Sequence, residues 1–154
     1  MGWQGDFVMH AIVATGAGFL FAVLWFDLMF DVQARQRPVS TETLSSIATY
    51  YRRVTIDAYP MNRLVSLVML MTLLALGVEA YQGHNPAWLE AASVLAALAP
   101  MSLAMFRTVR NAISVGRGGG SMAEQATLAL QIYRDHVFCL GSIAVLIGLQ
   151  WAAH

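Results

Sequence analysis

Charged side chains are scarce in this sequence. Aspartate, glutamate, lysine and arginine together make up 12% of its 154 residues, and 58% of the residues are hydrophobic. Soluble domains usually carry roughly 25% charged residues, so this composition excludes a chain whose whole surface faces water. Lysine is absent, and the nine arginines are balanced by nine acidic residues. Because neither sign is in excess, we expect no nucleic-acid partner.

The sequence has a single cysteine and no recognisable catalytic motif. Cys139 is the one cysteine of the sequence, so an intramolecular disulfide is excluded. It lies in an apolar run. The sequence also lacks the short motifs typical of hydrolases, zinc enzymes and redox proteins. The glycine-rich run at 116–120 lacks the Lys-Ser/Thr ending of a phosphate-binding loop, and a turn between two helices explains it. The sequence therefore leaves open whether the chain is an enzyme and which cofactor, if any, it binds.

Long apolar runs are what the sequence has in abundance. Residues 7–26 carry no formal charge, and as a helix they would span about 30 Å, the thickness of the hydrocarbon core of a bilayer. Three later runs resemble the first, although the third contains Pro100. Continuous runs disfavour barrel strands, whose side chains alternate in character. We predict an all-α integral membrane four-helix bundle, forming one domain over 1–154 with spans at about 7–29, 61–81, 87–108 and 134–153.

The arginines are distributed unevenly between the predicted loops. All nine lie in or beside the loops after spans one and three, at Arg35, Arg37, Arg52, Arg53, Arg63, Arg107, Arg110, Arg117 and Arg134. The opposite side carries Asp6, Glu79 and Glu90. Because positively charged loops remain in the cytoplasm, we predict an integral protein of the bacterial inner membrane, with both termini outside and membrane lipids as partners.

A segment at about 40–58 has the pattern of an amphipathic helix on the cytoplasmic side. Its apolar residues recur at helical spacing along one arc: Leu44, Ile47, Tyr51, Val54 and Ala58. Two placements fit this pattern. The helix lies in the head-group layer beside anionic lipid, or it packs under the bundle.

A helix start is predicted before the fourth span. Ser121 and Glu124 match the capping box, in which each residue satisfies a backbone N–H group of the other. If this helix continues into span four, it is longer than the hydrocarbon core, and its first turns project into the cytoplasm.

Ionisable residues gather at the inner ends of the predicted spans. Asp27 and Asp31 are four residues apart and share one helix face, and His136 lies at the inner end of span four. Ionisable groups at membrane depth are costly and either pair or mark a pathway. We predict an inner-face polar cluster of Asp27, Asp31, Arg52, Arg53, Arg63, Arg107, Arg110, Arg134 and His136. It is either a salt-bridge network that fixes loops to helices or a site that handles a proton or an anion.

His10 lies one turn inside the outer end of span one, among apolar residues. A single histidine in such surroundings can be the axial ligand of a haem or a chlorophyll, and we predict His10 as the cofactor-binding residue. The alternative is a hydrogen bond across the bundle. His84 and His154 fall on the same predicted side, but no pair of these histidines has short ligand spacing, and we predict no metal site.

Small residues form stripes that allow helices to approach closely. The stripes are Ala14, Gly18 and Ala22 in span one and Gly141, Ala144 and Gly148 in span four. They serve packing within the bundle or between subunits.

Three functions follow from these features. The first is a small membrane protein that acts as a packing or accessory subunit of a homo-oligomer or a larger membrane complex. The second is a transporter or membrane enzyme for a small lipophilic or anionic molecule that uses the inner-face polar cluster. The third is a carrier of haem, chlorophyll or metal through His10.

Overall fold

The structure, a computed structural model, describes the backbone of residues 2–36 and 38–153, and the side chains of this range except those of residues 2–6 and 59. Three residues considered above therefore lie outside the described part: the side chain of Asp6, and all of Arg37 and His154.

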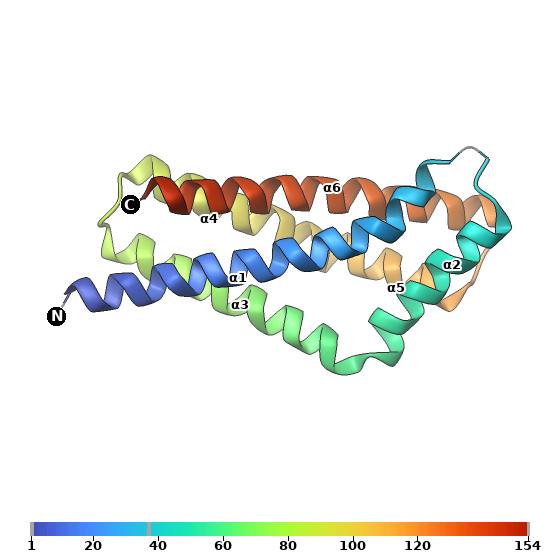
Figure 1. The fold of residues 1–154 in the computed structure, drawn as a ribbon, viewed down its shortest axis with the longest axis horizontal. Coiled ribbons are helices and arrows are strands. Elements are labelled where there is room, and N and C mark those ends of the chain that lie inside the picture. Colours follow the sequence, from blue (N-terminus) through green and yellow to red (C-terminus); the bar gives the residue numbers. More distant parts are fainter. Residues whose placement is uncertain (1, 37, 154) are drawn as a thin grey trace.

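Four long helices lie side by side and form the bundle (Figure 1). They are α1 (Gly2–Asp31), α3 (Tyr59–Gln82), α4 (Ala87–Leu103) and α6 (Met122–Ala152). The described residues form no strand. The prediction of an all-α four-helix bundle is therefore confirmed.

Shorter elements complete the chain at one end of the bundle (Figure 1). They are the 3-10 turn η1 (Val32–Arg35), α2 (Thr41–Arg52), the π-helical turn η2 (Arg53–Asp57), the π-helical turn η3 (Ala104–Thr108) and α5 (Val109–Arg117). The two chain ends lie at the opposite end of the bundle. We call the end with α2 and the α5–α6 turn the arginine end, and the other the terminal end.

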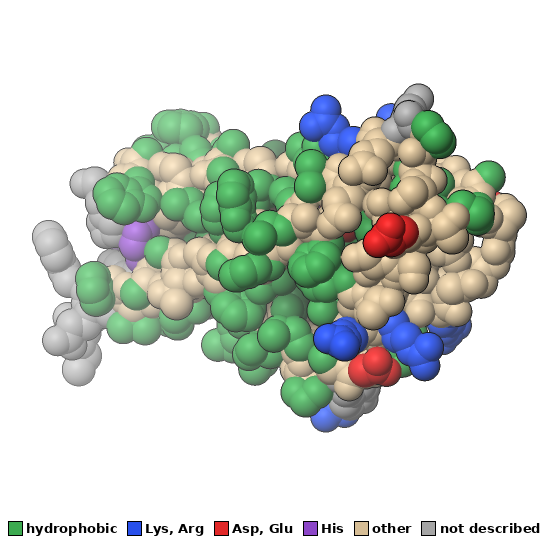
Figure 2. Space-filling view, turned by 45° about the vertical axis from the view of Figure 1, so that its right-hand side comes forward, with side chains coloured by type: hydrophobic (Ala, Val, Ile, Leu, Met, Phe, Trp, Pro, Cys, Tyr) green, Lys and Arg blue, Asp and Glu red, His purple; other side chains and the backbone are tan. Residues whose placement is uncertain are grey.

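Each long helical segment has the length and composition of a membrane span. The segments are Phe7–Arg35, Pro60–Gln82, Ala87–Arg117 and Met122–Ala152. Figure 2 shows hydrophobic side chains over much of the visible surface and charged side chains gathered toward the arginine end. The eight described arginines are all exposed. Four helical segments are thus long and apolar enough to cross a membrane, which is compatible with an integral membrane protein.

The core of the bundle is built by all four long helices. Its buried residues are Val13, Ala17, Leu20, Ala75, Leu76, Ala97, Met101, Ile143 and Leu146. Gly16 allows α1 to approach α3 closely, because a Cβ atom at this position would collide with the buried side chain of Thr72. Thr72 itself donates a hydrogen bond to the carbonyl oxygen of Val68.

A second core lies beyond the four-helix core, at the arginine end. The apolar face of α2, with Leu44, Ile47 and Tyr51, is buried there against residues of α5 and α6. The sequence left two placements of this helix open. In the structure, α2 packs under the bundle. The Ser40 hydroxyl caps α2 by accepting a hydrogen bond from the Thr43 amide at 3.1 Å.

Helix α6 begins with the predicted capping box. The Ser121 hydroxyl accepts a hydrogen bond from the Glu124 amide, and the Glu124 carboxylate accepts one from the Ser121 amide. The helix continues for 31 residues, about 46 Å at 1.5 Å per residue. It is therefore longer than the hydrocarbon core, and its first turns build the second core.

Gly116 of α5 lies against the backbone of α2. A Cβ atom there would lie 2.8 Å from the backbone nitrogen of Arg52 and 3.0 Å from the carbonyl carbon of Tyr51. These are backbone atoms, which do not move aside as a flexible side chain does.

We predict that Gly116→Ala displaces α2 and lowers the free energy of unfolding by about 1–3 kcal/mol, because backbone overpacking outweighs the gain in helix propensity. Denaturant unfolding in mild detergent and hydrogen exchange of the α2 amides measure this effect. Gly119→Ala is the control, because a Cβ atom at Gly119 has no atom within 4 Å. Equal stability and equal α2 protection in the two variants would contradict the prediction.

Candidate functional site

The site is built around one histidine of α6 that lies between two carboxylates of α1. His136 Nδ1 is 2.6 Å from Asp31 Oδ2, and His136 Nε2 is 3.9 Å from Asp27 Oδ2. Asp27 and Asp31 are one helical turn apart, so their side chains leave α1 on the same face. Both nitrogen atoms of the ring therefore face a carboxylate.

Two neighbouring tyrosines of α2 donate hydrogen bonds to these carboxylates. The Tyr50 hydroxyl donates a 2.5 Å hydrogen bond to Asp27 Oδ1, and the Tyr51 hydroxyl donates a 2.6 Å hydrogen bond to Asp31 Oδ1. The ring of Tyr50 stacks on Phe30 with 4.0 Å between the ring centres. Each carboxylate thus has one tyrosine hydroxyl on one oxygen and faces the imidazole with the other. We call these five residues the carboxylate–histidine cluster.

The members of the cluster differ in how much of each is exposed to solvent. Asp31 is 1% exposed and His136 is 7% exposed, whereas the Asp27 side chain retains 17% of its exposure. Burying an ionised carboxylate is costly unless it is paired and hydrogen-bonded. The hydroxyl groups and the imidazole supply these partners, and Asp27 is the member nearest to the surface.

The tyrosines remain protonated donors over a wide pH range. Burial, followed by the charge of Asp27, raises the pKa of Tyr50 well above its usual value. Burial and the charge of Asp31 raise the pKa of Tyr51 likewise. The physical cause is that a tyrosinate would be desolvated beside a carboxylate.

A third carboxylate, which is also buried, lies next to the cluster. Asp135 is 1% exposed and accepts bidentate hydrogen bonds from the Arg107 guanidinium. Arg107 Nε lies 3.0 Å from Asp135 Oδ2. Thr108 donates a further hydrogen bond of 3.0 Å to the same oxygen. Arg107 and Thr108 both belong to the π-helical turn η3, a kind of irregularity that is frequent at functional sites. The charges of Asp135 and Arg107 therefore compensate each other.

The turn η3 follows Pro100, which lies inside α4 and has no N–H group to donate to the preceding turn. The carbonyl oxygen of Pro100 accepts a hydrogen bond from the Cys139 thiol at 3.6 Å. Cys139 is thus a buried residue at the contact of α4 with α6.

The structure brings together three of the predicted inner-face residues, Asp27, Asp31 and His136. The candidate partners from the sequence were arginines, but the two carboxylates bind tyrosines and face the histidine instead. Arg107 donates a hydrogen bond to Asp135, the residue directly before His136. The other predicted members are exposed at the arginine end: Arg52, Arg53, Arg63, Arg110 and Arg134.

Three residues of the site were not predicted from the sequence, namely Tyr50, Thr108 and Asp135, and neither was the role of Tyr51. Tyr51 was placed on the apolar arc of α2, and its hydroxyl was the available signal. Asp135 stands directly before His136 and gave a similar signal. Thr108 and Tyr50 offered none, since their contacts depend on how separate helices pack.

His10 lies at the terminal end, where its Nδ1 is 3.8 Å from Glu79. The described residues contain no group of three or more His, Cys, Asp or Glu side chains suited to a metal ion. The ligation of haem or chlorophyll by His10 stays a prediction.

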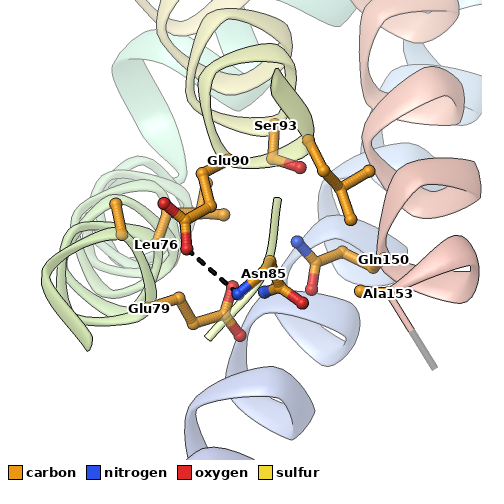
Figure 3. A pocket seen from close by; sticks show the side chains of 9 residues that line it. Leu76, Glu79, Asn85, Glu90, Ser93, Gln150 and Ala153 are labelled. Carbon is orange, nitrogen blue, oxygen red and sulfur yellow. Dashed lines mark hydrogen bonds between the residues drawn. The ribbon is translucent and has the colours of Figure 1, made fainter. Parts of the chain in front are cut away.

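A small pocket lies at the same end between α3, α4 and α6. Its volume is about 10 Å³, which is room for about one water molecule. In Figure 3, Glu79, Asn85, Glu90 and Gln150 surround it. The backbone N–H group of Asn85 donates a 3.3 Å hydrogen bond to Glu90 Oε1, and the buried Gln150 Oε1 has no protein partner. A water molecule is the ligand that fits this volume and this acceptor.

We predict that Tyr50 does not ionise in the folded protein at the pH where an unfolded tyrosine does, about 10. Because the pKa of Tyr50 is raised by folding, the stabilisation from its bound proton is complete below about pH 10 and is lost as pH rises further. Tyrosinate absorbance of the wild type and of Tyr50→Phe in mild detergent tests this. The two curves should coincide while the protein is folded and differ by one tyrosinate in denaturant. An extra ionisation in the folded wild type near pH 10 would contradict the prediction.

Comparison of the chain with protein-family models, with curated proteins and with solved structures finds no match. The geometry and chemistry of these residues are therefore the basis for a proposal of function.

Proposed function

We propose that this protein is a packing subunit of the membrane, which associates laterally with further copies of itself or with the helices of a larger membrane complex. The observation that supports this proposal is that the small-residue stripes lie mostly on the outer surface of the bundle. Five of the six predicted stripe residues are exposed on the bundle: Gly18, Ala22, Gly141, Ala144 and Gly148. The sixth, Ala14, is half-buried.

The exposed stripes are not needed for contacts within the bundle. A Cβ atom built at Gly18, Gly141 or Gly148 has no atom within 4 Å. The close approach of α1 to α3 instead uses Gly16, on another face of α1. Small residues on an open membrane-facing surface allow another helix to approach the backbone, which is how van der Waals contact drives helix association in lipid.

The proposal includes an orientation in the bacterial inner membrane. The eight described arginines lie in or beside the segments at the arginine end, and positively charged loops favour the cytoplasmic side. The chain ends and the α3–α4 turn then face outward. The transporter, enzyme and cofactor-carrier functions stay predictions.

We predict that a cysteine placed at Gln82 is labelled by a membrane-impermeant maleimide in intact cells, whereas one placed at Gly119 is labelled only after permeabilisation. Gln82 ends α3 and Gly119 lies in the α5–α6 turn, and both are exposed. The native Cys139 is buried, so its background labelling is low. Equal labelling of both positions in intact cells would refute the orientation.

We predict that Gly18→Leu and Gly148→Leu weaken association of the protein about tenfold or more, since a loss of about 1.4 kcal/mol corresponds to that factor. Bulky side chains would hold the backbones of two helices apart. Cross-linking yield and native mass spectrometry in mild detergent measure the association.

Gly77→Leu is the matched control for these variants. Gly77 is an exposed glycine of a different span, α3, and a Cβ atom there also has no atom within 4 Å. If all three variants associate as the wild type does, or if all three lose association equally, the stripes are not the interface.

A further inference from the structure

The imidazole of His136 faces a carboxylate with each of its nitrogen atoms. A neutral imidazole has one N–H group, and its other nitrogen carries a lone pair. If the Nδ1–H group donates to Asp31 at 2.6 Å, Nε2 carries the lone pair and lies 3.9 Å from Asp27 Oδ2. A lone pair directed at an ionised carboxylate in a buried place is unfavourable. One additional proton, on the ring or on Asp27, removes this conflict.

Among the described residues, the elements next to the cluster do not supply the missing positive charge. From α2, Tyr50 and Tyr51 face the carboxylates with neutral hydroxyl groups. From η3, Arg107 faces Asp135 of α6, and these two charges cancel. From η1, Arg35 lies 5.8 Å above the ring of Tyr133. The charge balance of the cluster therefore depends on Asp27, Asp31 and His136.

We propose that Asp27, Asp31 and His136 form a proton-binding site, which holds one proton more than a neutral histidine between two ionised carboxylates. The proton is shared between the imidazole and the carboxylates, and it exchanges with the surroundings at Asp27, the least buried of the three. This site is separate from the lateral packing surface, so either proposal can fail without the other.

Exchange at Asp27 follows from the arrangement of the oxygens. Both oxygens of Asp31 are engaged inside the protein, by Tyr51 and by His136 Nδ1. Asp27 receives a hydrogen bond from Tyr50 on one oxygen, while its other oxygen lies 3.9 Å from the ring. That second oxygen is the place where a proton is taken up before it moves to Nε2.

Nitrogen NMR of the histidine side chains in mild detergent, together with infrared difference spectroscopy, tests this proposal on the intact protein. His136→Gln identifies the His136 signals by their loss. At neutral pH we expect either a doubly protonated His136 ring or a protonated carboxyl group that disappears in Asp27→Asn. A singly protonated ring, with no Asp27-dependent carboxyl signal at neutral pH, overturns the proposal.

The titration of His136 in variants separates a proton site from a structural ion pair. Asn at position 27 offers an N–H donor to Nε2, so Asp27→Asn should lower the pH at which the ring loses its second proton by about one unit or more. Asp57→Asn is the control, since Asp57 is exposed and lies 4.0 Å from Arg52 at the same end of the molecule. Where the wild-type ring is doubly protonated at neutral pH, equal small effects of the two variants on the His136 titration overturn the proposal.

Discussion

The burial of two carboxylates at one end of an apolar bundle is the constraint on which this structure depends. Asp31 is almost fully enclosed and Asp27 largely so, and neither is tolerated there as an unpaired charge. Their partners come from two other helices, the tyrosines of α2 and the histidine of α6. The position of α2 under the bundle is thus specified by polar contacts as well as by its apolar face. A slide of α2 by one turn would separate both hydroxyl groups from their acceptors.

The two cores have different surfaces around them. Exposed apolar side chains surround the core of the four long helices, and within it Gly16 lets α1 approach the buried Thr72 of α3 closely. The second core contains α2, a helix with a polar outer face, and buries apolar residues as a soluble domain does. Gly116 is at the seam between α5 and α2, where backbone lies against backbone. The long α6 joins both cores and carries His136 and Asp135 between them.

Several features of the fold were predictable because they depend on local sequence. Uncharged runs long enough to span a bilayer predicted the four helices, and Ser121 with Glu124 predicted the start of α6. The partners of the carboxylates were not predictable in this way. Tyr50 is 23 residues from Asp27, and His136 is 105 residues from Asp31, so their contacts depend on tertiary packing. The arginines seemed better partners by charge, but a guanidinium on a long stem reaches solvent at the end of the bundle. A tyrosine instead buries its ring and keeps its hydroxyl for the acceptor.

The choice of tyrosine over arginine has an electrostatic consequence. A guanidinium would neutralise a carboxylate, as Arg107 does for Asp135. A phenol stabilises the carboxylate by a hydrogen bond and leaves its charge in place, and the raised pKa of Tyr50 and of Tyr51 means that neither hydroxyl gives up its proton. Within the cluster, the negative charge of Asp27 and Asp31 is reduced when the His136 ring or Asp27 takes up a proton. Because the donors around the paired carboxylates are neutral, one additional proton, on the His136 ring or on Asp27, is what would balance the charge of this cluster.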